Sequence, residues 1–133
     1  MALVTIATDA SFDTGTASRA PHIAGDMVAG EALLACAPCY IRASDGKVLM
    51  TNATAADEKA RLAGFTPRAV AIGNPVDLFG LGTRMRYAAG LTPGAIYYLA
   101  ATAGRLDTAA TIGDAVGVVQ AVSDTDIRVT RAI

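Results

Sequence analysis

The sequence predicts an all-β fold, a small β-sandwich or barrel-like domain with one short helix and an extended N-terminal arm. Three observations lead to this prediction. The chain has 133 residues, the length of about one domain. Its apolar runs are short and are separated by Gly, Pro, Asp and Ser at the spacing of hairpins. Several runs alternate apolar and polar residues, and roughly eight or more short strands can be counted. We place the arm at residues 1–23 and the β-domain at residues 24–133.

The arm is predicted from a segment rich in Ala, Thr, Ser and Asp that carries one short alternating apolar run. Chain ends are often unstructured unless something holds them, so a free terminus is one interpretation. The other is an arm that becomes ordered on the surface of a partner. In that case we expect its contact residues to be Leu3, Val4, Ile6, Phe12 and Arg19.

The clearest hairpin joins residues 39–42 to residues 47–50 through Ser44-Asp45-Gly46. An Asp-Gly pair favours the positive φ angles that a two-residue type I′ turn requires. The sequence therefore predicts two paired strands joined by a tight turn of this type.

One segment interrupts the β pattern, because residues 55–62 are rich in alanine and predict a short helix between two strands. Thr54 can cap this helix, and acidic residues in its first turn and Arg61 near its end complement the helix dipole. Gly64 is predicted to end the helix, and residues 68–72 to form the next strand.

Residues 84–88 alternate, which puts two arginines on one face of a strand and Met85 with Tyr87 on the buried face. The pair Pro93-Gly94 predicts a type II turn, because Pro presets φ at the first central position and Gly supplies the positive φ of the second.

Four further strands are predicted toward the C-terminus. The first two form a hairpin that turns near Gly104. The third is apolar on both sides, which predicts a central strand covered on both faces. The fourth alternates, with apolar side chains inward. In chain order they are residues 96–101, 105–108, 115–122 and 126–131.

The charge of the chain is nearly balanced, with 11 Lys and Arg against 12 Asp and Glu, and the cationic residues are scattered. Binding driven by phosphate neutralisation is therefore not expected. No apolar run approaches the roughly 18 residues of a membrane span, and the first residues lack the positive region of a secretory signal. We expect synthesis in a cytoplasm and no nucleic-acid or membrane partner.

The apolar composition points instead to protein contacts. Hydrophobic residues make up 53% of the chain, but many are alanine and only 5% of residues are aromatic. In so short a chain, apolar side chains that cannot all be buried internally tend to lie at contacts between subunits or with a partner. Oligomerisation or docking is therefore expected.

The sequence offers little for catalysis. His22 is the only histidine, so a Ser-His-Asp or Cys-His arrangement would depend on it, and no G-x-S-x-G elbow is present. Two cysteines and one histidine fall short of a closed zinc site without a carboxylate. Gly80-Leu81-Gly82 lacks the third glycine of a dinucleotide loop. We therefore expect no enzyme activity, no cofactor and no metal.

The pair Cys36-Ala37-Pro38-Cys39 matches the C-x-x-C spacing of redox enzymes, which need a helix that begins at the first cysteine. Pro38 and the β-branched and aromatic run after Cys39 favour a strand instead. Buried free thiols are the preferred interpretation, while a structural disulfide and a thiol oxidoreductase stay as alternatives.

The C-terminal half carries a resemblance to a known family. Three sequence segments carry this resemblance: L-T-P-G-A-I-Y-Y-L at residues 91–99, Gly-Arg-Leu at 104–106 and G-D-A-V-G-V-V at 113–119. They resemble the C-terminal β-module of tailed-phage capsid decoration proteins, also called cement proteins. The hairpin of residues 39–48 and the Ala-rich helix that ends before Phe65 are similar to the preceding part of that module. The resemblance covers residues 25–133.

The resemblance implies a virion structural protein that binds the outer surface of the phage head and stabilises the capsid. It implies a homotrimer at local threefold positions, bridging subunits of the major capsid protein. The protein would then be located on the capsid exterior. A phage tail-fibre or receptor-binding module is the alternative, since the same Y-Y phrase occurs there, and Tyr97 and Tyr98 would then contact a host glycan.

Overall fold

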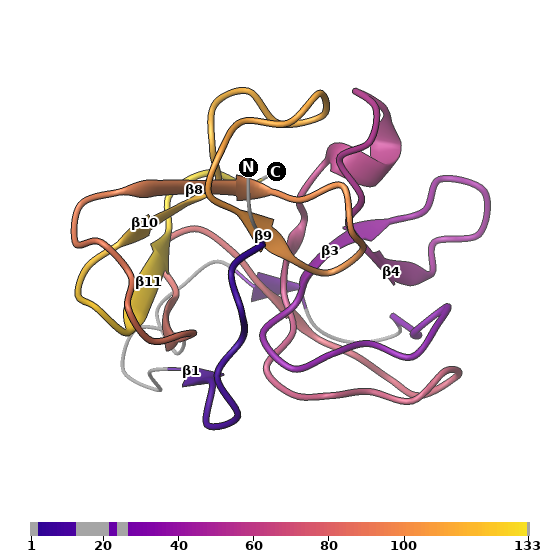
Figure 1. Ribbon diagram of the computed structural model, residues 1–133. Helices are drawn as coiled ribbons and strands as arrows, with labels where there is room; N and C mark the ends of the chain where they lie inside the picture. The colour runs from indigo at the N-terminus through magenta and orange to yellow at the C-terminus, as the bar shows by residue number, and fades with distance from the viewer. Residues whose placement is uncertain (1–2, 13–21, 24–26, 133) are drawn as a thin grey trace.

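The computed structural model describes residues 3–12, 22–23 and 27–132, and its fold is all-β, as the sequence predicts (Figure 1). The strands of this described part form two antiparallel sheets. One sheet has six strands in the order β1-β7-β11-β10-β8-β9, and the other has five in the order β2-β6-β5-β3-β4. The elements are β1 (Ser11–Phe12), β2 (His22–Ile23), β3 (Pro38–Ile41), β4 (Val48–Met50), the 3-10 helix η1 (Glu58–Ala60), β5 (Gly64–Phe65), β6 (Leu78–Phe79), β7 (Arg84–Arg86), β8 (Ile96–Leu99), β9 (Leu106–Asp107), β10 (Val119–Ala121) and β11 (Asp126–Val129).

The N-terminal segment is extended but lies along the rest of the chain. The Val4 N–H donates to the Leu106 carbonyl at 2.9 Å, and the Ala7 N–H donates to the Tyr87 carbonyl at 2.7 Å. Further along, β1 pairs with β7, and β2 pairs with β6 of the other sheet. Both sheets therefore take an edge strand from the segment that the sequence assigned to the arm.

Buried apolar side chains form two clusters. The larger, called core 1, contains the inward side chains of the six-stranded sheet, together with Phe65 from the other sheet. The smaller, called core 2, belongs to the five-stranded sheet. The strand alternation predicted for residues 84–88 and 126–131 accounts for much of core 1. Fully buried members of core 1 include Met85, Tyr87, Leu99, Leu106 and Ile127, and those of core 2 include Cys39, Val48 and Leu78.

The β3–β4 hairpin is confirmed, but its turn differs from the prediction. Cys39 pairs with Met50 and Ile41 with Val48. The chain reverses through a longer loop, in which the Gly46 N–H donates to the Arg42 carbonyl at 2.7 Å. Gly46 has a φ of 72°, whereas Asp45 does not have the positive φ that a type I′ turn needs at both central residues. Its carboxylate instead accepts from the Arg42 guanidinium at 2.6 Å, which lowers the pKa of Asp45 to about 2.

The helix predicted over residues 55–62 is wrong in length and in its cap. Only η1 is helical there, and Asp57 caps it by accepting from the Lys59 N–H at 3.0 Å. The Thr54 hydroxyl donates to the Asn52 side chain instead. No residue of η1 is buried, so the segment lacks the packed apolar face that stabilises short helices. It does connect two strands, as predicted.

The strand predicted over residues 68–72 is reduced to one isolated bridge. Val70 and Leu33 exchange two backbone hydrogen bonds, of 2.8 and 3.0 Å. Immediately afterwards the chain turns, because the Asn74 N–H donates to the Ala71 carbonyl and Gly73 has a φ of 86°. Ile72 is left exposed on this turn.

The type II turn and the hairpin that follows it are confirmed. The Ala95 N–H donates to the Thr92 carbonyl at 3.0 Å, and Gly94 has a φ of 85°. β8 then pairs with β9, with Leu99 opposite Leu106, and the turn between them passes through Gly104 at positive φ. These elements follow from local residue chemistry.

The central strand predicted over residues 115–122 is confirmed only in its second half. β10 begins at Val119, while Ala115 and Val116 are exposed. The break falls at Gly117, whose φ is 96°. The Asp114 carboxylate accepts from the N–H groups of Val116 and Gly117, which bends the chain out of the sheet.

Candidate interaction surface

The most exposed large apolar side chains lie on one loop. We call residues 108–118, which connect β9 to β10, the β9–β10 loop; Figure 1 shows it in orange at the top of the view. Ile112 is 79% exposed and Val116 is 69% exposed. Aliphatic side chains that face water gain free energy when another surface covers them, at about 25 cal/mol per Å². This loop is therefore the candidate interaction surface. Outside this loop, Ile72 is 67% exposed, and Leu81 and Leu3 are exposed to a smaller extent.

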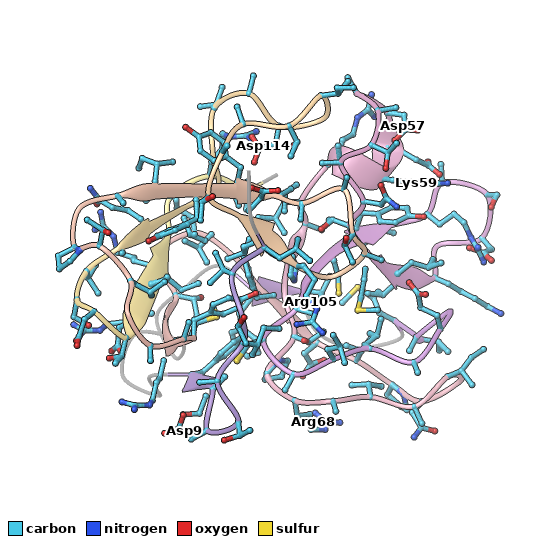
Figure 2. All side chains as sticks on the ribbon, viewed as in Figure 1. Asp9, Asp57, Lys59, Arg68, Arg105 and Asp114 are labelled. Carbon is cyan, nitrogen blue, oxygen red and sulfur yellow. The ribbon has the colours of Figure 1, made fainter. Side chains whose placement is uncertain are left out.

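A buried carboxylate holds the β9–β10 loop in place. Figure 2 labels Asp114 within this loop, and its side chain is fully buried. It accepts hydrogen bonds from the N–H groups of Leu99 at 2.8 Å, Val116 at 3.2 Å and Gly117 at 2.9 Å, and from the Arg131 guanidinium at 2.6 Å. Four donors on β8, the loop and the C-terminal segment thus converge on one side chain.

The tip of the loop is a two-residue turn around Ile112 and Gly113. Thr111 and Asp114 exchange backbone hydrogen bonds of 2.9 and 3.2 Å on either side of it. The Gly113 N–H donates to the Ala53 carbonyl at 2.9 Å. A Cβ at Gly113 would lie 2.6 Å from the Ala55 carbonyl oxygen, so only glycine fits there without a shift. Ile112 is therefore exposed on a rigid support.

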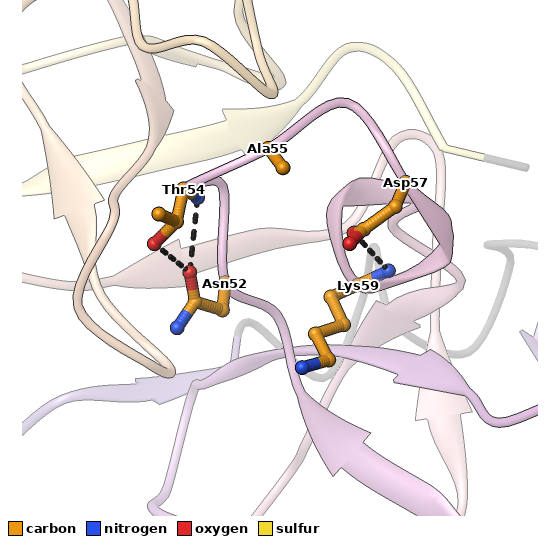
Figure 3. A pocket seen from close by; sticks show the side chains of 5 residues that line it. All are labelled: Asn52, Thr54, Ala55, Asp57 and Lys59. Atoms are coloured by element: carbon orange, nitrogen blue, oxygen red, sulfur yellow. Dashed lines mark hydrogen bonds between the residues drawn. The ribbon is translucent and has the colours of Figure 1, made fainter.

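One hollow borders this tip, and a second hollow shares Thr54 with the first. The first has a volume of about 140 Å³, has an almost entirely apolar lining and includes Ile112 itself; its other lining residues are Ala53, Thr54, Ala101 and Thr111. The second, of about 310 Å³, is more polar (Figure 3). Its wall is fixed by hydrogen bonds from the Thr54 N–H to the Asn52 amide oxygen and from the Lys59 N–H to the Asp57 carboxylate. Lys59 and Asp57 are both exposed.

The residues predicted as arm contacts have different positions. Val4 is only 7% exposed and belongs to core 1, so in this conformation it cannot also contact another protein. Ile6 and Phe12 are partly buried against the same core, and the Phe12 ring packs edge-on against Phe79. Leu3 is 47% exposed and lies beside β9. Arg19 lies outside the described residues.

Both cysteines are free and buried. Cys36 belongs to core 1 and Cys39 to core 2, so the two thiols face different clusters. Burial raises the pKa of the Cys36 thiol from 9.0 to about 11. Burial, and to a smaller extent the negative charge of the Glu31 carboxylate, also raises the pKa of the Cys39 thiol. A redox C-x-x-C site needs the opposite shift. Within the described residues, no three His, Cys, Asp or Glu side chains group as metal ligands would.

We expect neither cysteine to react with a thiol reagent in the folded protein. Burial blocks access, and a pKa of about 11 leaves a very small thiolate fraction at pH 8. Labelling with Ellman's reagent should therefore be at least about 100-fold slower in buffer than in guanidinium, where two thiols per chain should react. Rapid labelling of the folded chain, lost in Cys36→Ser, would contradict this burial.

The tyrosines named for glycan binding do not form an exposed aromatic pair. Tyr97 is 6% exposed and its hydroxyl accepts a hydrogen bond from the Thr92 N–H at 3.2 Å. Tyr98 is on the opposite face of β8 and is partly buried, opposite Asp107. The two rings therefore do not share one exposed face of β8.

Sequence reasoning missed the β9–β10 loop as a surface, because the apolar run after Asp114 resembles a buried strand. The available signal was local: an Asp followed three residues later by Gly117 favours a side-chain-stabilised turn. Among the described residues, no helix has the length and hydropathy to cross a membrane. No protein-family model matches the chain, and no curated protein matches it either.

Proposed function

We propose that this chain is a virion structural protein that binds the outer surface of a tailed-phage head and stabilises the capsid. In this proposal it acts as a trimer at local threefold positions and contacts the major capsid protein. The observation that carries the proposal is exposed aliphatic surface on hydrogen-bonded backbone, at Val116 in the β9–β10 loop and at Leu3 beside β9. The sequence resemblance in residues 91–119 supports the same function.

The geometry favours a protein partner over a small molecule. Val116 is exposed to water on a loop that hydrogen bonds hold, whereas small-molecule sites are concave and surround their ligand. Because Asp114 and Gly113 already fix the loop, little conformational entropy is lost when a partner covers it. A protein that binds only the assembled shell stabilises that state by mass action.

In this proposal the arm contacts the shell through Leu3 and not through Val4. Val4 is buried in core 1, so Leu3 is the described arm residue with the most exposed apolar surface. Deleting residues 1–23 would remove β1 and β2 from their sheets, and the resulting loss of folding would hide any loss of binding. A point substitution at Leu3 is the cleaner test.

We expect the purified protein to cosediment with heads that lack it and to raise the temperature at which those heads release DNA. Leu3→Ser should bind at least about tenfold more weakly, because it removes apolar area from the contact. Ile72→Ser is the matched control, since Ile72 is a 67% exposed aliphatic side chain on the turn that follows Val70. Its binding should equal that of the wild type.

Two results would reject the proposal: heads that bind no wild-type protein, or virions that an antibody against this chain labels only on the tail. Wild-type binding by Leu3→Ser would reject the contact at Leu3 while leaving head binding in place.

A further inference from the structure

We infer that the tip of the β9–β10 loop and the apolar hollow beside it form a contact between copies of this chain, in which Ile112 of one copy fills the hollow of the next. The inference concerns the copy-to-copy contact within the proposed function. It can fail while binding to heads is retained, because it is tested on the protein alone.

First, the surface carries both a projecting apolar side chain and an apolar hollow. Ile112 projects from the tip, and the adjacent hollow of about 140 Å³ is lined by Ala53, Ala101 and Thr111. An apolar cavity of about 150 Å³ holds a benzene molecule, so this hollow suits one aliphatic side chain. Because Ile112 and the hollow lie side by side, a rotation axis close to them can place Ile112 of one copy over the hollow of another copy.

The second step is charge. The β9–β10 loop carries one charged side chain, Asp114, which is buried and paired with Arg131. The neighbouring hollow shares Thr54 with the apolar one and forms its charged border, because it is lined by one exposed carboxylate, Asp57, and one exposed ammonium, Lys59 (Figure 3). Two copies related by rotation can therefore place an acid opposite a base, whereas a wall of one sign would repel its own copy.

The third step is rigidity. Gly113 packs against the backbone of Ala53 and Ala55, and Asp114 fixes the base of the loop with four hydrogen-bond donors. Figure 2 shows Asp114 and the Asp57–Lys59 segment on the same end of the molecule. The projection, the hollow and the charged border are thus held in one arrangement before association, which reduces the entropy cost of binding.

The experiment measures mass against concentration for the full chain by sedimentation equilibrium. We expect reversible association in the wild type, weakened at least about tenfold in Ile112→Ser, since burial of one isoleucine is lost. Ile72→Ser, which removes a comparably exposed isoleucine elsewhere, should associate as the wild type does. Lys59→Glu should weaken association, and Asp57→Lys combined with Lys59→Glu should recover part of it.

A crosslink tests the position directly. Ile112→Cys and Ala101→Cys are made as separate variants and mixed under mild oxidation; the native thiols are buried, so they do not compete. A covalent dimer that forms in the mixture, and forms less in either variant alone, supports the inference. A wild type that stays monomeric at millimolar concentration overturns it, and so does association that survives in Ile112→Ser. Thermal unfolding of each variant confirms that it is folded.

Discussion

Replacing Asp114 with alanine is expected to lower the free energy of unfolding by about 3–5 kcal/mol, because it removes the acceptor of three backbone N–H groups and of the half-exposed Arg131 guanidinium. The side chain is fully buried, and its four donors come from three parts of the chain. The N–H groups of Leu99, Val116 and Gly117 would be left without their acceptor. Chemical denaturation measures the loss, and amide exchange should accelerate at these three residues.

Two further variants test whether the effect at Asp114 comes from its role as a hydrogen-bond acceptor. Asp114→Asn keeps the volume but turns an N–H donor toward groups that already donate, so it should also destabilise strongly. Arg131→Ala should cost less, about 1–2 kcal/mol, because Arg131 is half-exposed and Asp114 keeps its three backbone donors. A loss below about 1 kcal/mol in Asp114→Ala would show that the loop is not held by this carboxylate.

The elements predicted correctly from the sequence are those whose cause is local. Pro93 and Gly94 specify the type II turn through their own φ preferences, whatever lies around them. The alternation of residues 84–88 places Met85 and Tyr87 in core 1, because the strand period is two in any sheet. Local rules of this kind need no knowledge of the partner strand.

The predictions that were wrong depend on residues far apart in the sequence. The segment after Thr54 has good helix formers, but its Lys59 carbonyl accepts from the Asn52 N–H. The residue before Thr54 is held to a distant part of the chain, because the Ala53 N–H donates to the Ala100 carbonyl. Tertiary hydrogen bonds therefore override a weak local preference. No window of sequence around Thr54 contains Ala100.

The candidate surface was missed for the same reason. An apolar run such as residues 115–122 has the same composition whether it is buried or exposed. The deciding interaction is between Asp114 and Leu99 on a neighbouring strand, with Arg131 near the end of the chain. The local pattern of Asp114 and Gly117 indicates a turn, and the long-range contacts of Asp114 with Leu99 and Arg131 fix that turn on the folded protein.

The second large effect is expected at Phe65, which joins the two sheets. Phe65 lies in β5 of the five-stranded sheet, yet its fully buried side chain belongs to core 1, built largely on the six-stranded sheet. Phe65→Ala should lower the free energy of unfolding by about 3–5 kcal/mol, through lost transfer free energy and the cavity left between the sheets. Urea denaturation followed by circular dichroism measures it.

Phe79 provides the matched control on the neighbouring strand, because Phe79 is opposite Phe65 in the sheet but only partly buried. Phe79→Ala should cost about 1–2 kcal/mol, mostly from its edge-on contact with Phe12. Where Phe65→Ala is too unstable to fold, Phe65→Leu keeps most of the volume and should lose about 1 kcal/mol. Equal losses at both phenylalanines would contradict a special role for Phe65, since the sheets would then be joined by general packing and not by this ring.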